Sequence, residues 1–262
     1  MPDDDATPPP SDAEATSADA SGDSGATGRE RRRTPLWLET IILLAVALGM
    51  ALIIKTFLVQ AFYIPSASME PGLVENDRIL VQKVSSWFDD TPSRGDVVVF
   101  EDPGGWLAGP EPGPQTVLAK AMAKVGLYPT GGHLVKRVVG LPGDTVTCCD
   151  DLGQLQVNGV SVDEDAFIRP QADCDGPMPN GCRRDWSVTV PEDRIFVMGD
   201  NRAASADSSD RLCGPKNASC DPDRPFVPLD LIVGKVFVLV WPFDHAHFIG
   251  TPDAFDAVPD PQ

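Results

Sequence analysis

The sequence predicts an all-β domain preceded by a single transmembrane α-helix. Three observations support this fold class. One apolar segment lies near the N-terminus, a series of short strand patterns follows it, and Gly, Pro, Asn and Asp residues punctuate those patterns. We therefore expect a β-rich domain over residues 61–249, after a transmembrane helix over residues 35–60.

The N-terminal segment, residues 1–34, is expected to be disordered and cytoplasmic. Residues 1–28 are rich in Asp, Ser, Ala, Pro and Gly, and they contain no aromatic residue and no aliphatic residue larger than alanine apart from Met1. Such a segment cannot bury enough apolar surface to offset the entropy lost on ordering. A basic cluster of Arg29 and Arg31 to Arg33 then precedes the apolar segment.

Residues 36–59 form the predicted membrane helix, because they are apolar apart from two charged residues and two threonines. A helix of this length spans roughly 36 Å, which exceeds a hydrocarbon core of about 30 Å. Arginines precede it, whereas no Lys or Arg lies between Lys55 and Arg78. The positive-inside rule then predicts a single-pass protein of the cytoplasmic membrane, in contact with the lipid bilayer, with its N-terminus cytoplasmic and everything after residue 59 outside. A cleaved signal peptide is the alternative, although the leader is long and the apolar run exceeds a usual h-region.

Composition limits the partners that the chain is expected to have. The formal net charge of −18 over 262 residues argues against a nucleic-acid binder, which needs a basic face. The only His pair, His245 and His247, has neither a Cys pair nor a His-Glu-x-x-His helix beside it. We therefore interpret these histidines as surface residues and expect no metal site.

Six cysteines suit an oxidising compartment, in agreement with a domain outside the cytoplasm. The spacings of Cys174 with Cys182 and of Cys213 with Cys220 permit two short closed loops, and we predict both bridges. Cys148 and Cys149 then remain, either as a vicinal bridge or as free thiols, because sequence alone does not decide connectivity.

The strand patterns are short runs bounded by turn residues. Within residues 155–162, Asn158-Gly159 suits the positive φ angles of a type I′ hairpin turn. A Gly/Pro-rich insertion between residues 102 and 132 contains a possible short helix near residues 117–125. The C-terminal tail, residues 250–262, has no periodic pattern and is expected to be loose. The predicted strand runs are 78–84, 96–100, 134–141, 155–162, 186–190, 194–198 and 231–241.

A loop over residues 63–73 contains two serines, Ser66 and Ser68, between Pro65 and Pro71. The prolines make the loop stiff and irregular, and an extended chain would present both hydroxyls on one side. One hydroxyl can then act as a nucleophile and the other as a hydrogen-bond donor to developing negative charge. A solvated turn is the alternative interpretation, because Ser and Pro are ordinary loop residues.

Lys136 is a candidate general base. It lies between Leu134 and Val138 on one face of a predicted strand, so its amine is expected to be partly desolvated. Desolvation lowers the pKa of a lysine, and a neutral amine can take a proton from a serine hydroxyl. A gatekeeper lysine on an edge strand is the alternative.

Four motifs occur in order after the apolar segment, and together with the membrane helix they resemble bacterial type I signal peptidases (leader peptidases). The resemblance covers roughly residues 37–242, and the Gly/Pro-rich insertion, the adjacent Cys148 and Cys149 and the closing strand are similar to actinobacterial members. The four motifs are Pro65-Ser66-Ala67-Ser68-Met69-Glu70-Pro71, Gly95-Asp96-Val97-Val98-Val99-Phe100, Lys136-Arg137-Val138-Val139-Gly140-Leu141-Pro142-Gly143-Asp144, and Gly199-Asp200-Asn201-Arg202 through Ser205-Ala206-Asp207-Ser208.

The resemblance implies a signal-peptidase-like β domain that acts as a membrane-anchored serine endopeptidase. Ser68 matches the nucleophile and Lys136 its general base, while the hydroxyl of Ser66 and the backbone N–H of Ser68 match the oxyanion hole. Ser205 matches the residue that orients the lysine amine. The implied substrates are exported preproteins with small residues at the first and third positions before the cleavage site, and the family needs neither metal nor cofactor.

Supporting residues are also implied, with one departure from the family pattern. Arg137 and Asp200 match a structural salt bridge, and Asp207 matches a structural acid. The family's last motif reads Asp-Ser-Arg, whereas here an arginine follows only at Arg211, so the partner of Asp207 is open. The interval between Lys136 and this motif is short, which predicts a small elaboration and not a full second domain.

Two other functions are compatible with the same sequence. One is a specialised maturase of this fold that acts on a pilin or on a relaxed set of precursors. The other is a membrane-tethered β scaffold without activity, against which the presence of both Ser68 and Lys136 argues.

Overall fold

The structure is a computed structural model that describes residues 35–53, 58–83, 91–107, 132–169, 171, 184–214 and 219–261. Three predictions lie outside these residues: the disorder of residues 1–34, the short helix near residues 117–125, and the bridge between Cys174 and Cys182.

The first element is helix α1, Leu36–Ile53, which consists of 18 residues. Residues 59 and 60 were expected to be helical, but they begin strand β1, Val59–Tyr63, and pair with Gln82 and Val81. Pairing in a sheet satisfies their backbone groups, and local apolar content does not reveal such a partner. Across the described residues, no helix is both long and apolar enough to cross a membrane.

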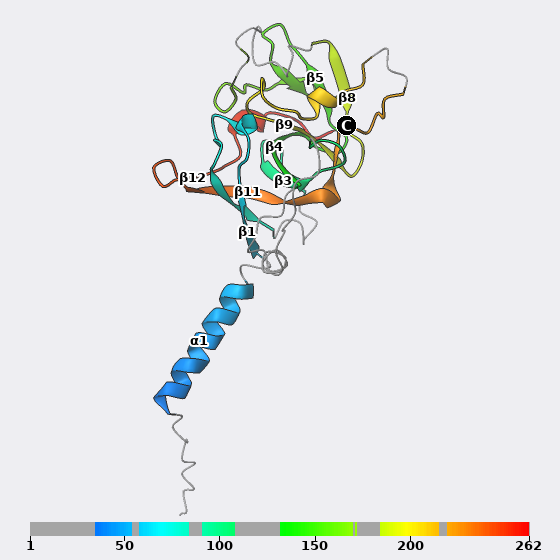
Figure 1. The fold of residues 1–262 in the computed structure, drawn as a ribbon. Helices are drawn as coiled ribbons and strands as arrows, with labels where there is room; N and C mark the ends of the chain where they lie inside the picture. Colours follow the sequence, from blue (N-terminus) through cyan, green and yellow to red (C-terminus); the bar gives the residue numbers. More distant parts are fainter. Residues whose placement is uncertain are drawn as a thin grey trace, which may run out of the picture. The chain divides into compact units, whose positions relative to one another are not determined.

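An antiparallel eight-stranded sheet forms the larger part of the β domain (Figure 1). The long strand β11 pairs with β2 on one side and β3 on the other. A strand from late in the sequence therefore lies between two strands from early in the sequence. In path order the sheet contains β1, β2 (Arg78–Gln82), β11 (Ile232–Trp241), β3 (Val97–Glu101), β4 (His133–Gly140), β9 (Arg194–Met198) and β10 (Val227–Pro228), and β12 (His247–Phe248) pairs with β11.

A smaller sheet of four strands occupies the interval between Lys136 and Asp207, as the small elaboration predicted. Its central hairpin turns at Asn158 and Gly159, which have φ angles of 51° and 80°, and the predicted positive-φ turn is therefore confirmed. The strands, in sheet order, are β7 (Val160–Ser161), β6 (Leu155–Val157), β5 (Thr145–Cys148) and β8 (Trp186–Thr189).

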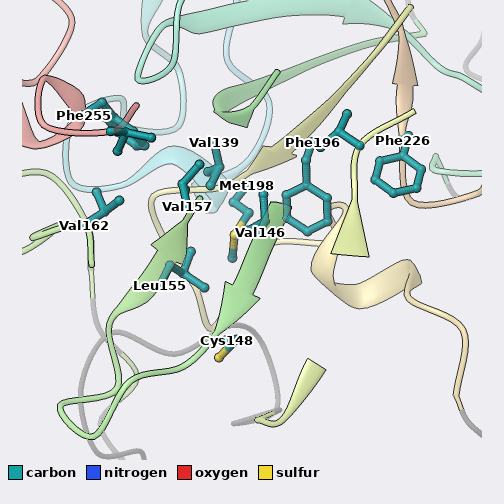
Figure 2. Close-up of a cluster of buried hydrophobic side chains, with 12 residues drawn as sticks. Val139, Val146, Cys148, Leu155, Val157, Val162, Phe196, Met198, Phe226 and Phe255 are labelled. Carbon is teal, nitrogen blue, oxygen red and sulfur yellow. The ribbon is translucent and has the colours of Figure 1, made fainter. Parts of the chain in front are cut away.

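The two sheets share one apolar core, shown in Figure 2. Val146 and Val157 of the small sheet are fully buried together with Phe196 and Met198 of β9. Gly140 at the end of β4 permits this approach, because a Cβ there would lie 2.7 Å from a methyl carbon of Val146. The core therefore connects the small sheet directly to strand β9, which leads into the last motif.

The C-terminal tail was expected to be loose, and this prediction is wrong. Phe255 and Val258 are buried in the same core, with 5% and 7% of their surface exposed. The carbonyl of Pro259 accepts hydrogen bonds from Arg94 and from Asn158. Two apolar side chains in a polar segment have no periodicity, so the sequence does not reveal that they fill a core.

The all-β prediction is confirmed, and each predicted strand run contains a strand. The predicted bridge between Cys213 and Cys220 is present, with an S–S distance of 2.04 Å. Cys148 and Cys149, which the sequence left open, form a vicinal disulfide.

Candidate active site

Ser66 and Ser68 lie on a tight turn that follows strand β1. Residues Ala67–Met69 form one turn of 3₁₀ helix, and Ser66 is its extended N-cap residue with φ −145° and ψ 156°. The sequence predicted an irregular loop whose hydroxyls share one side if the chain is extended, whereas a helical turn forms here and buries Met69 in the core, with only 1% of its surface exposed. The hydroxyls nevertheless remain on one side, because Ser66 Oγ lies 3.3 Å from Ser68 Oγ.

Asn201 fixes this turn from the last motif. Its backbone N–H donates to the carbonyl of Ser68, and its side-chain Nδ2 donates to the carbonyl of Ala67, both at 3.0 Å. No role for Asn201 was predicted from the sequence. Its position in the Gly-Asp-Asn-Arg motif was a signal, but the carbonyls that it binds lie more than a hundred residues earlier in the chain.

Lys136 reaches this turn from the middle of strand β4. Its Nζ lies 2.7 Å from Ser68 Oγ and donates to the carbonyl of Val135 at 3.1 Å. Strand pairing places Lys136 opposite Val98 of β3, in the interior of the sheet and not on an edge strand. Only 4% of its surface is exposed, so the gatekeeper interpretation does not hold.

Burial lowers the pKa of Lys136 from its ordinary value of 10.5 to about 8. Desolvation is the main cause, since it disfavours the charged ammonium form. The carboxylates of Asp207 and Asp200 act in the opposite direction, and the positive charge of Arg211 adds to the lowering. About a tenth of the amine is therefore neutral at pH 7, and about half at pH 8.

Ser205 lies beside the serine turn and is fully buried. Its Oγ donates to Asp207 Oδ2 at 2.6 Å. A Cβ on Gly199 would collide with both Ser205 Oγ and the carbonyl oxygen of Ser68. The side chain of Ser205 and the backbone of Ser68 thus both pack directly against Gly199.

Arg137, the neighbour of Lys136 on β4, forms a buried ion pair with Asp200. Its Nε and Nη2 lie 2.8 and 2.6 Å from the two carboxylate oxygens of Asp200. Its Nη1 donates to the carbonyl of Gly95 at 2.7 Å, and its guanidinium lies 4.4 Å from the ring centroid of Phe167. Every side of this cation therefore has a partner.

Asp207 binds hydroxyl and amide groups. These groups are the partners that the sequence left open, because the arginine of the family pattern is displaced to Arg211 here. Besides Ser205, its carboxylate accepts from the backbone N–H of Gly199 and from both N–H and Oγ of Ser209. Arg211 instead donates from Nη2 to the carbonyl of Trp106 and stacks on that ring at 4.7 Å.

A second buried ion pair, between Glu164 and Arg202, was missed by the sequence analysis. Arg202 Nη1 and Nη2 lie 3.0 and 2.5 Å from the carboxylate oxygens of Glu164, and Arg202 Nε donates to the carbonyl of Gly199 at 3.1 Å. Arg202 belongs to a recognised motif, whereas Glu164 lies in a segment without any pattern. The pair anchors the backbone of Gly199 from the side of the small sheet.

A serine hydroxyl beside a buried amine, with a second hydroxyl near it, is the arrangement of a serine hydrolase with a lysine base. Comparisons with known proteins place the chain among serine peptidases. Residues 37–241 match the family described as signal peptidase, peptidase S26. The chain is 37% identical over 231 residues to the probable signal peptidase I of Mycobacterium leprae, which covers 81% of this chain and 78% of that protein.

Two further relatives have similar names. The chain is 36% identical over 245 residues to signal peptidase I of Mycobacterium tuberculosis, with 87% of this chain and 81% of that protein covered. It is 34% identical over 218 residues to the probable signal peptidase I-2 of Synechocystis, with 82% and 79% covered. The chain belongs to the signal peptidase family, peptidase S26, as a serine peptidase of the bacterial type I group.

Proposed function

We propose that this protein removes N-terminal signal peptides from exported preproteins by means of a dyad of Ser68 and Lys136. The observation that carries the proposal is the 2.7 Å distance between Lys136 Nζ and Ser68 Oγ in a buried site. The substrate class rests on the signal peptidase I names of the relatives.

In the proposed reaction, neutral Lys136 takes the proton of Ser68 as its Oγ attacks the carbonyl carbon of the scissile bond. The resulting lysine ammonium gives that proton to the leaving amine, and the signal-peptide part remains as an ester on Ser68. Lys136, neutral again, then takes a proton from a water molecule that attacks the ester. Collapse of the second intermediate returns the proton to Ser68.

The oxyanion of each tetrahedral intermediate needs donors that are already in place. We assign this task to the backbone N–H of Ser68 and the hydroxyl of Ser66. Ser68 is the second residue of its 3₁₀ turn, and the first N–H groups of a helical turn have no partner within it. The 3.3 Å separation of the two serine oxygens supports placing Ser66 beside the reacting carbonyl.

Ser205 is proposed to orient the amine of Lys136, and the ion pair of Arg137 with Asp200 to hold the last motif against β4. Both proposals rest on buried groups that pack around Gly199 and strand β4. Preproteins with small residues at the first and third positions before the cleavage site are the proposed substrates, and neither metal nor cofactor takes part.

Residues 35–60 are proposed to contain a membrane anchor, with residues 1–34 in the cytoplasm and the β domain outside. The arginines before the apolar segment support this orientation, and the exposed apolar side chains of α1, among them Leu43 and Leu44, support the anchor itself. A reporter enzyme fused after Gln262 tests it. The reporter should be active only if it is of the kind that works outside the cytoplasm.

Cleavage of a preprotein with an Ala-x-Ala site is the central test. Wild type should release the mature protein, Ser68→Ala should not, and Ser187→Ala on the exposed face of β8 serves as the matched control. Cleavage of a pilin precursor but not of the general preprotein would favour the maturase. Absence of any cleavage by the folded, inserted wild type would favour the inactive scaffold.

A further inference from the structure

Asp207 is a buried carboxylate, and none of its hydrogen-bond donors among the described residues is a cation. Only 1% of its surface is exposed. In the part of the chain that the structure describes, the groups that bind it are the hydroxyls of Ser205 and Ser209 and the N–H groups of Gly199 and Ser209. Such donors stabilise a carboxylate charge but do not cancel it.

The arginine that follows in the sequence does not take this place. Arg211 stacks on Trp106 and donates to its carbonyl, and its buried Nε has no hydrogen-bond partner within the described ranges. Ser209 occupies the position next to Ser208 at which the family pattern has arginine. It binds Asp207 Oδ1 twice, from its N–H at 3.0 Å and from its hydroxyl at 2.7 Å.

The other carboxylate oxygen of Asp207 faces the site. Oδ2 accepts from the N–H of Gly199 at 2.9 Å and from Ser205 Oγ at 2.6 Å. A hydroxyl has a single hydrogen, so Ser205 can only accept from the remaining groups around it. The orientation of Ser205 thus depends on the carboxylate of Asp207, whose other oxygen is bound by Ser209.

We infer that Ser209 is a positioning residue, which fixes the carboxylate of Asp207 and thereby sets the pH at which Lys136 becomes neutral. This inference rests on the proposed function of Lys136 as general base. The charged side chains that act on Lys136 are Asp207, Asp200 and Arg211. The charge of Asp200 is offset by its ion pair with Arg137. Asp207 also acts on Arg202, whose own pair with Glu164 holds it on the other side of Gly199.

Two substitutions should move the acid limb of kcat/KM in opposite directions. Asp207→Asn removes a negative charge that favours the ammonium form of Lys136, so the limb should move to lower pH, by about one unit. Ser209→Ala removes a hydroxyl dipole that partly offsets that charge, so the limb should move to higher pH by roughly a few tenths of a unit. A merely structural role would lower activity at all pH values without moving the limb.

The experiment measures preprotein cleavage from pH 6 to pH 10 by the full-length protein in detergent micelles. Ser209→Ala combined with Asp207→Asn should behave like Asp207→Asn alone, because the hydroxyl then has no charge to offset. Ser161→Ala is the matched control, since Ser161 donates in the same way to Asp150 on the exposed hairpin. Its limb should coincide with that of wild type.

An unmoved limb in Ser209→Ala, or a shift to lower pH, would overturn the inference. Should Asp207→Asn fail to fold, Ser209→Ala alone still decides, because it deletes a single oxygen atom. Lys136→Arg in the same assay distinguishes failure of the proposed function from failure of the role inferred for Ser209. Activity of that variant would refute the proposed base itself, whereas its inactivity with an unmoved Ser209→Ala limb would refute only the role of Ser209.

Discussion

The two faces of strand β4 bury adjacent cations in opposite ways. Lys136 and Arg137 have 4% and 6% of their surface exposed, and successive residues of a strand point to opposite faces. On one face, Arg137 binds both carboxylate oxygens of Asp200. On the other, the amine of Lys136 lies against the hydroxyl of Ser68 and the carbonyl of Val135.

The difference shows how a sequence obtains a structural cation and a base from neighbouring residues. Burial disfavours either charge, but a bidentate carboxylate offsets that cost for a guanidinium that cannot lose its proton. A lysine without such a partner responds by a lowered pKa, here to about 8. The partner on each face, and not the degree of burial, determines which residue can do acid–base chemistry.

Exchanging the cation on the Lys136 face should have the largest effect. Lys136→Arg keeps the charge but cannot supply a neutral base, so cleavage should fall by about 10²–10⁴-fold, the usual contribution of a general base. In wild type, kcat/KM should rise with pH along an acid limb near pH 8, because only the neutral amine is active. The measurement is steady-state cleavage of a preprotein against pH.

The opposite exchange, Arg137→Lys, is its control. It replaces a bidentate guanidinium by a point charge and should mainly reduce stability, since no proton transfer depends on it. Near wild-type cleavage by folded Lys136→Arg would show that Lys136 is a structural lysine and that the dyad is wrong.

Ser66→Ala tests whether the Lys136 face stabilises a transition state. Loss of one oxyanion donor costs about 10²–10³-fold in rate, and kcat should fall by this amount. KM should change little, because the hydroxyl acts mainly in the transition state. Steady-state kinetics separate the two constants, and an unaltered kcat would remove Ser66 from the mechanism.

Breaking the pair on the other face should affect folding first. Asp200→Asn leaves the charge of Arg137 buried with a neutral partner, and loss of a partner in such pairs costs about 3–5 kcal/mol of unfolding free energy. Urea unfolding in detergent measures it. The exposed Asp165→Asn is the control and should differ by less than about 0.5 kcal/mol. A similarly small change in Asp200→Asn would mean that the pair contributes little.

Local patterns in the sequence predicted this contrast only in part. The alternation around Lys136 was enough to predict its buried face, and the Asn158-Gly159 pair was enough to predict a turn. Strand β1 depends on its pairing with β2, and the buried tail residues Phe255 and Val258 depend on core residues far back in the chain; a pattern within either segment alone does not contain these partners.

The candidate site shows the same limit. Motif positions led to Ser68 and Lys136, whose separation the structure gives as 2.7 Å. The hydrogen bonds from Asn201 to the serine turn were not predicted, because their acceptors are backbone carbonyls and carbonyls have no sequence signature. Ser209 was not predicted as the partner of Asp207, because the family pattern has a charged residue in this role.

Removing the charge of Lys136 should make the fold more stable, which is the smallest and most specific effect. The pKa of this lysine is lowered from 10.5 to about 8 by folding, so the folded state binds its proton less tightly than the unfolded state. Unfolding then takes up a proton between these two values, and the free energy of unfolding rises as pH increases from about 8 towards about 10.5. Below pH 8 the full cost of the buried ammonium is present.

Lys136→Met should therefore unfold with a free energy higher by on the order of 2–3 kcal/mol at pH 7, with the gain shrinking above pH 8. Lys235→Met should have the opposite sign, because the Lys235 amine pairs with the buried carboxylate of Asp96 at 2.5 Å. Urea unfolding in detergent between pH 6.5 and pH 9.5 measures both. Equal stability of Lys136→Met and wild type at pH 7 would mean that the buried amine is not destabilised as an ammonium ion, and the contrast between the two faces of β4 would then lose its physical basis.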